Sequence, residues 1–137
     1  MRTSGGTFTG GVTGTSFSAT TSISAKDGFF QTSDETLKDF YDEIDVDFDK
    51  LKKIPKRYYK WKSNPNGDLE IGTSAQKVQD VYPELVGKGE KLSVDYSKLS
   101  VVALKAIDLL KEENEQLKDK VSTLEDELRT IKKILGL

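Results

Sequence analysis

The chain has 137 residues, of which 35% are hydrophobic and 32% are charged. This composition supplies few apolar side chains for a compact monomer of this size, so we expect part of the core to be shared between subunits. The formal net charge of -2 gives no reason to expect nucleic acid or an anionic membrane as a partner.

Cysteine and histidine are both absent from the sequence. Disulfide bonds are therefore excluded, a zinc site would lack its main ligands, and catalysis with a histidine base is excluded. No apolar run approaches the roughly 18 residues of a membrane span, and no signal peptide is expected before Thr3. We therefore expect no metal, no cofactor and no membrane partner.

Residues 1–32 are rich in glycine, serine and threonine and carry almost no charge. This composition is also typical of a flexible linker. However, Phe17–Ala25 alternates apolar and polar residues and contains no proline, which predicts a strand. Because isolated two-stranded hairpins are marginally stable, other copies of the chain should pair with it. We interpret residues 1–32 as the C-terminal end of a β-structured stalk whose partners are other copies of the chain, with a turn at Lys26-Asp27-Gly28.

Residues 33–98 have a mixed composition that predicts a small α+β domain. Apolar residues recur at helical spacing, which predicts a helix over Asp34–Phe48, and Pro55 stops any helix that runs through Leu51. The remaining expected elements are strands at 57–62, 69–71 and 92–96, a turn at 64–68 and a short helix at 74–82.

Residues 99–137 carry apolar residues whose spacing alternates between four and three. This heptad pattern predicts a left-handed coiled coil. The seam residues, which we expect at the subunit interface, are Ile107, Leu110, Asn114, Leu117, Val121, Leu124, Leu128, Ile131 and Leu135. Positions a are Ile107, Asn114, Val121, Leu128 and Leu135, and the other four residues take position d.

The charges that flank this seam favour identical parallel chains in register. Each residue at position g has the opposite charge to the residue at position e that would face it on a neighbouring chain. The pairs are Glu113–Lys118, Lys120–Glu125 and Glu127–Lys132. The number of chains stays open at this point, because Asn114 fits a dimer whereas Leu128 with Ile131 favours three or more strands.

Five sequence blocks in the middle region occur in an order that matches one known family. They are Ser33-Asp34-Glu35-Thr36-Leu37-Lys38, Tyr59-Lys60-Trp61-Lys62, Ile71–Val78, Pro83-Glu84-Leu85-Val86 and Val94–Leu99. With these blocks, residues 33 to about 110 resemble the intramolecular chaperone domain at the C-terminus of phage tailspikes, tail fibres and neck appendages. The best-known example is the endosialidase tailspike.

This resemblance implies a homotrimer that guides three strands of a fibre stalk into an intertwined β-structure. It further implies that the domain then cuts itself off by a serine–lysine reaction before the motif serine. In this sequence the cut would fall between Thr32 and Ser33, with Ser33 as nucleophile and Lys38 as base. The N-terminal stalk would be the folding client. The chaperone would act in the host cytoplasm during virion assembly, and only the stalk would stay in the virion.

Serine–lysine chemistry sets two physical requirements. A serine nucleophile needs a base, and lysine serves only when neutral, so its ordinary pKa of about 10.4 must fall through burial or a nearby cation. Residues five apart on a continuous helix also point about 140° apart. Ser33 must therefore lie outside regular helix, or it must meet Lys38 of another subunit.

Simpler interpretations exist for the same residues. Thr32 and Glu35 have capping-box spacing, so Ser33 could belong to a helix cap, and Lys38 could be a surface lysine. The protein would then be a non-enzymatic trimerisation tip of a fibre or adhesin. A tip that binds sugars through Tyr58, Tyr59 and Trp61 is a third possibility. For Tyr59 and Trp61 we prefer packing, and for Gly72 a backbone requirement.

Overall fold

The computed structural model describes residues 5–137, and the chain divides into two units whose boundary in the sequence falls between Tyr41 and Asp42. In the first unit, residues 5–32 form neither helix nor strand, so the strand expected at 17–25 is absent from the single chain. Its expected partners were other copies of the chain, and the β-structured stalk stays a prediction. The backbone bends at residues 26–27, and Gly28 has a φ of 100°, as the predicted turn requires.

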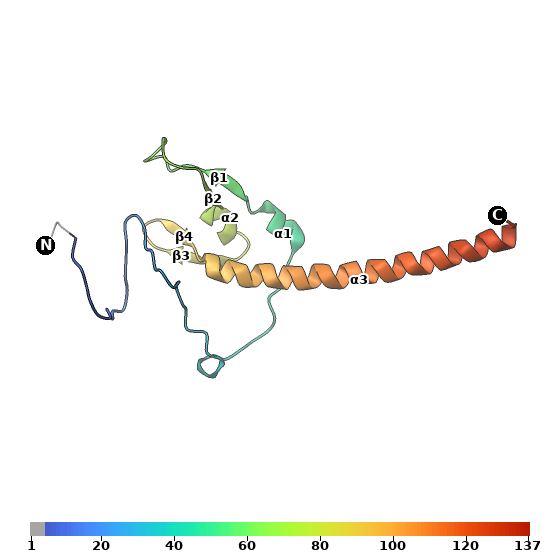
Figure 1. The fold of residues 1–137 in the computed structure, drawn as a ribbon, viewed down its shortest axis with the longest axis horizontal. Helices are drawn as coiled ribbons and strands as arrows, with labels where there is room; N and C mark the ends of the chain where they lie inside the picture. The colour runs from blue at the N-terminus through green and yellow to red at the C-terminus, as the bar shows by residue number, and fades with distance from the viewer. Residues whose placement is uncertain (1–4) are drawn as a thin grey trace. The chain divides into compact units, whose positions relative to one another are not determined.

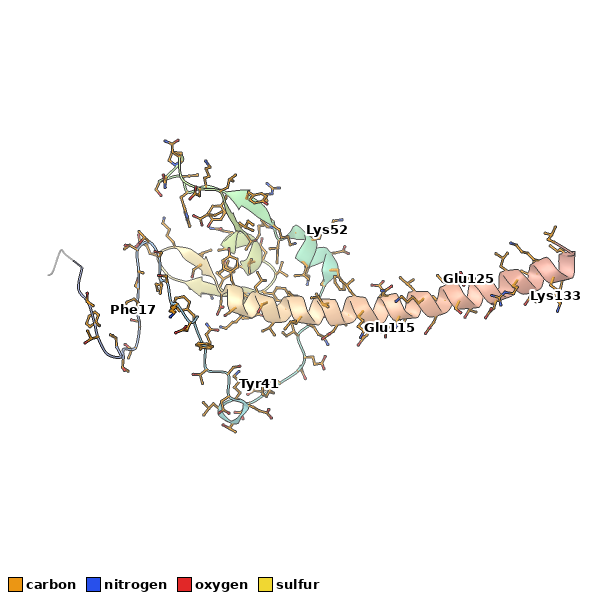
Figure 2. All side chains as sticks on the ribbon, in the orientation of Figure 1. Phe17, Tyr41, Lys52, Glu115, Glu125 and Lys133 are labelled. Atoms are coloured by element: carbon orange, nitrogen blue, oxygen red, sulfur yellow. The ribbon has the colours of Figure 1, made fainter. Side chains whose placement is uncertain are left out.

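The helix predicted over Asp34–Phe48 is wrong. Only a single 3₁₀ turn, η1 (Glu35–Leu37), forms there, and the next helix begins at Phe48. The exposed fractions of Leu37, Phe40 and Tyr41 are 73%, 74% and 91%, so the apolar face of the expected helix has nothing to pack against. Figure 2 shows the side chain of Tyr41 projecting from this segment. A short helix without such packing is marginal in water.

The second unit is a small mixed α/β domain followed by one long helix (Figure 1). Its elements are α1 (Phe48–Lys53), β1 (Arg57–Tyr59), β2 (Glu70–Gly72), α2 (Ala75–Gln79), η2 (Pro83–Leu85), β3 (Val86–Lys88), β4 (Leu92–Val94) and α3 (Tyr96–Leu135). The strands form two antiparallel pairs, β1 with β2 and β3 with β4. As predicted, α1 ends before Pro55, and a turn at Asn64–Gly67 lies in the connection between β1 and β2.

The core of this unit is small. The side chain of Val78 on α2 is completely buried, and five other residues are at most 7% exposed. These are Ile54, Tyr82, Leu85, Val86 and Val102. Because Val102 belongs to the second turn of α3, its burial fastens the start of the long helix to the domain.

The long helix α3 begins at Tyr96 and has 40 residues. Asp95 caps its start by accepting a 3.1 Å hydrogen bond from the Lys98 amide, and Gly136, at φ 72°, ends it. The eight apolar seam residues from Ile107 onward are 50–65% exposed. The side chains of Glu115, Glu125 and Lys133 project from this free length of helix in Figure 2. No helix among residues 5–137 is long and apolar enough to cross a membrane.

Candidate functional site

The structure brings Ser33 and Lys38 together within one chain. The Lys38 Nζ atom lies 2.6 Å from Ser33 Oγ, which is hydrogen-bonding distance. The sequence allowed this contact only if the pair did not share a regular helix. Ser33 indeed precedes η1, and Lys38 follows it in extended conformation with φ -131° and ψ 141°. A single chain therefore suffices to form the contact.

The turn between the two residues is fixed by Asp34. Its Oδ1 atom accepts hydrogen bonds from the Thr36 amide at 2.9 Å and the Thr36 hydroxyl at 2.7 Å. The Thr36 hydroxyl, and then the Thr36 amide, lower the pKa of Asp34 below its ordinary value. At the other end, the Lys38 amide donates to the Glu35 carbonyl at 3.1 Å. The loop therefore closes after three residues, and Lys38 can reach back to Ser33.

The alternative of a capping box between Thr32 and Glu35 is not what forms, because Asp34 is the N-cap and its side chain accepts a hydrogen bond from the Thr36 amide. Thr32 lies before the cap in irregular backbone. The hydroxyl of Ser33 contacts the Lys38 amine instead of a backbone amide. The simple interpretation of Ser33 as a capping residue therefore loses its support, while its catalytic role stays a prediction.

Both members of the pair are exposed in the single chain. In this contact the Lys38 amine is the donor and the serine oxygen is the acceptor. A general base must do the opposite and accept the serine proton. The contact therefore provides the geometry of a serine–lysine dyad, while removal of water from the lysine must come from another source.

A second cluster joins two aromatic rings through one carboxylate. Glu70 accepts hydrogen bonds from the Tyr59 hydroxyl at 2.7 Å and from Trp61 Nε1 at 2.9 Å. The two rings pack edge to face, with centroids 5.3 Å apart and planes at 88°. The hydrogen bond to Glu70 raises the pKa of Tyr59. No pattern in the sequence indicated that Glu70 would bind these two rings. Its contact with Tyr59 follows from the pairing of β1 with β2, in which the two residues face each other directly.

Gly72 lies where a side chain would collide with this cluster. An added Cβ atom would lie 2.9 Å from Tyr59 Cε1 and 3.0 Å from the Tyr96 hydroxyl, which supports the preferred backbone requirement. The Thr73 amide donates to the same Tyr96 oxygen at 3.3 Å. Tyr59, Gly72 and Tyr96 come from three separate sequence blocks, so these blocks share one structural centre.

The same aromatic residues line a cavity of about 470 Å³ beside α2 and β4. Glu70 occupies the polar atoms of Tyr59 and Trp61, and the side chain of Tyr58 is 71% exposed. The Tyr59 and Trp61 rings pack on each other, but Trp61 is 58% exposed, so their packing in a core or interface stays a prediction. Binding of a sugar by these residues stays a prediction. Within residues 5–137, no group of three or more acidic, cysteine or histidine side chains is arranged to hold a metal ion.

Comparison with known families gives a match in the middle of the chain. Residues 33–87 match the family model described as chaperone of endosialidase. The matched region begins at Ser33 and ends within β3, and it confirms the resemblance inferred from the ordered sequence blocks. A search among curated proteins found no match to the chain.

Proposed function

We propose that this chain is a C-terminal intramolecular chaperone that releases itself by autoproteolysis between Thr32 and Ser33. The family match supports the chaperone role. The 2.6 Å contact between Lys38 Nζ and Ser33 Oγ carries the proposal of self-cleavage. The protein assembles as a homotrimer and guides folding of the stalk of a phage tail fibre, tailspike or neck appendage. It acts in the host cytoplasm, and the stalk alone enters the virion.

The reaction needs only groups at the cut and one water molecule. Neutral Lys38 takes the proton from Ser33 Oγ, which attacks the carbonyl carbon of Thr32. The bond from this carbon to the Ser33 nitrogen breaks, and Lys38 returns the proton to the departing amine. Water then hydrolyses the ester, which leaves a carboxylate on Thr32 and restores the Ser33 hydroxyl. The products are residues 1–32 and 33–137, and each chain reacts once.

In this proposal, assembly of the trimer removes water from the exposed pair of Ser33 and Lys38. When three chains pack along the seam, the three stalk segments converge on the three copies of the site and displace water from them. Loss of water destabilises the lysine ammonium and favours the neutral amine that the reaction requires. Cleavage therefore follows assembly, so that a stalk is released only after it has trimerised.

Two substitutions at the dyad test this mechanism by intact mass spectrometry before and after incubation. Ser33→Ala removes the nucleophile and should leave the chain uncut. Lys38→Arg keeps the positive charge, but guanidinium does not lose its proton near neutral pH, so this variant should also stay uncut. Lys50→Arg is the matched control and should cut like the wild type. Each protein must first be shown to be trimeric, and full cutting by a trimeric Lys38→Arg variant would remove Lys38 from the mechanism.

The rate of cleavage should also depend on pH in one direction. Because only the deprotonated lysine accepts the serine proton, the rate of wild-type cleavage should rise as pH increases. A quenched time course at several pH values, with fragments quantified by mass spectrometry, measures this dependence. A rate that falls as pH increases would contradict lysine as the base.

The non-enzymatic trimerisation tip remains the competing function, and the exposure of both Ser33 and Lys38 favours it. It predicts a stable trimer whose mass never changes. Prolonged incubation of the trimeric wild type, followed by intact mass measurement, separates the two functions.

A further inference from the structure

An apolar groove of about 610 Å³ lies in the second unit, where α1 and β2 border the first turns of α3. Phe48 on α1 and Ile71 on β2 contribute one side of it, and their side chains are 40% and 75% exposed. The other side comes from α3 and includes Leu99, Ala103 and Ile107. An exposed apolar surface of this kind requires a partner.

The heptad register shows where the groove lies relative to the seam. Ile107 takes position a, so Ala103 takes position d, and both residues belong to the seam as well as to the groove. Leu99 and Ala106, which also line the groove, take position g. The groove is therefore continuous with the seam and opens on its g side.

In parallel coiled coils, a residue at position g faces the residue at position e five places later on the next chain. The partner of Leu99 is accordingly Leu104 of a neighbouring copy. Leu104 is 61% exposed in its own chain. Further along α3 the corresponding pairs are oppositely charged, as in Glu113 with Lys118. The g-to-e pair between neighbouring chains is thus apolar beside the apolar groove. The g-to-e pairs from Glu113 onward, where the helix extends beyond the domain, are charged.

We propose that Leu104 of a neighbouring copy inserts into this groove beside Leu99, so that each domain docks on the long helix of the next subunit. The proposal rests on the parallel trimer of the proposed function and extends it from the coiled coil to the domain. Its consequence is that the domain and the coil assemble as one body. The occupant of the groove is a second copy of this chain. This agrees with the expectation, drawn from the low content of apolar residues, that part of the core is shared between subunits.

Cysteine cross-linking tests the contact directly, because the described chain has no cysteine of its own. The double variant Leu99→Cys with Leu104→Cys should form a covalent trimer on treatment with a short bismaleimide, seen on a denaturing gel. In parallel chains in register the two residues are about 7.5 Å apart along the axis alone, beyond the roughly 7 Å between Cα atoms that a disulfide spans, so a cross-linker with a spacer is needed. Only cross-links between different chains give a covalent trimer on the gel, and three of them close a ring.

Two control pairs make the result decisive. Glu113→Cys with Lys118→Cys places the same g-to-e pair in the coil and should also give a covalent trimer. Leu99→Cys with Val101→Cys moves the second thiol to the outer face of the helix and should give none. If the coil pair links while the groove pair does not, the groove has another occupant and our inference is overturned, although the trimer stands. If neither links, the parallel trimer of the proposed function fails as well.

Leu99 also packs against the domain core, so its replacement could disturb folding. The second g-to-e pair at the groove avoids this difficulty. Ala106→Cys with Lys111→Cys changes a small groove residue and an exposed one, and it should likewise give a covalent trimer. The docking proposal would be overturned if this pair failed to cross-link while the coil pair succeeded. The variant must first be shown to have the circular dichroism spectrum of the wild type.

Discussion

The two helices η1 and α3 begin in the same way and end very differently. Each starts at an aspartate whose side chain accepts a backbone amide, from Thr36 at 2.9 Å and from Lys98 at 3.1 Å. Hydrogen bonds lower the pKa of both aspartates, with the Thr36 and Ser97 hydroxyls as the largest causes. Yet η1 lasts three residues and α3 lasts 40. A good cap begins a helix but does not determine its length.

Packing in the first turns separates the two helices. In α3, Val102 is only 4% exposed, so the start of the helix is fastened to a core before the free length begins. After η1, Phe40 and Tyr41 are 74% and 91% exposed and find no core. Because nucleating a helix is costly and extending it is cheap, an anchored first turn lets α3 continue. The apolar seam further along α3 is exposed in the single chain, and in the proposed function it packs against the other chains of a trimer.

The largest effect is expected from substitutions in the seam that prevent the chains from assembling. Leu117→Asp together with Leu124→Asp would bury charges at position d in every chain, at a cost of roughly several kcal/mol per trimer. We expect loss of assembly by sedimentation and loss of cleavage by mass spectrometry. Gln116→Asp with Thr123→Asp adds the same charges outside the seam and should leave both intact. A monomeric seam variant that still cuts normally would show that the site is complete within one chain and that assembly is not a checkpoint.

An intermediate effect should come from the anchor of α3. Val102→Ala removes two buried methyl groups and should lower the free energy of unfolding by about 2 kcal/mol. Val101 is the matched control, since it has the same side chain one residue earlier but is 51% exposed. Val101→Ala should change stability by no more than about 0.5 kcal/mol. Thermal unfolding followed by circular dichroism measures both, and equal losses would mean that the core does not anchor this helix.

The smallest effect should come from the cap of α3. The pKa of Asp95 is lowered in the folded chain, so its contribution to stability is present above the ordinary aspartate pKa. That contribution is lost as pH falls through the lowered value. Asp95→Asn keeps a capping side chain that does not titrate. Wild type and variant should have similar Tm at pH 7, and the wild type should lose more on acidification.

Because the wild type and Asp95→Asn share all their other carboxyl groups, the contributions of those groups to the change in Tm cancel when the two proteins are compared at each pH. Glu43, for example, also has a lowered pKa because it is hydrogen-bonded to Lys105, and this pair is present in both proteins. Identical Tm changes in the two proteins between pH 7 and pH 2 would rule out a titrating cap.

Local patterns in the sequence predicted the parts that depend on near neighbours. The heptad spacing predicted a long helix, Pro55 predicted the end of α1, and the turn residues at 64–68 predicted the connection between β1 and β2. The helical spacing after Asp34 failed because periodicity shows which face would be apolar, but not whether a surface exists to receive it. β3 was missed because Gly87 interrupts its short pattern, and its partner β4 supplies the pairing.

By itself, the sequence determined that α3 would carry an exposed apolar seam with opposite charges beside it, because both features follow from spacing along one helix. It also placed Ser33 five residues before Lys38, but that spacing is equally compatible with a cap and a surface lysine. Only the tertiary structure decided that Lys38 Nζ lies against Ser33 Oγ. It likewise decided that Glu70 joins Tyr59 to Trp61 and that Gly72 leaves room for Tyr96. The physical reason is that these contacts depend on where a turn closes and which strands pair, and neither is encoded in the identity of one residue.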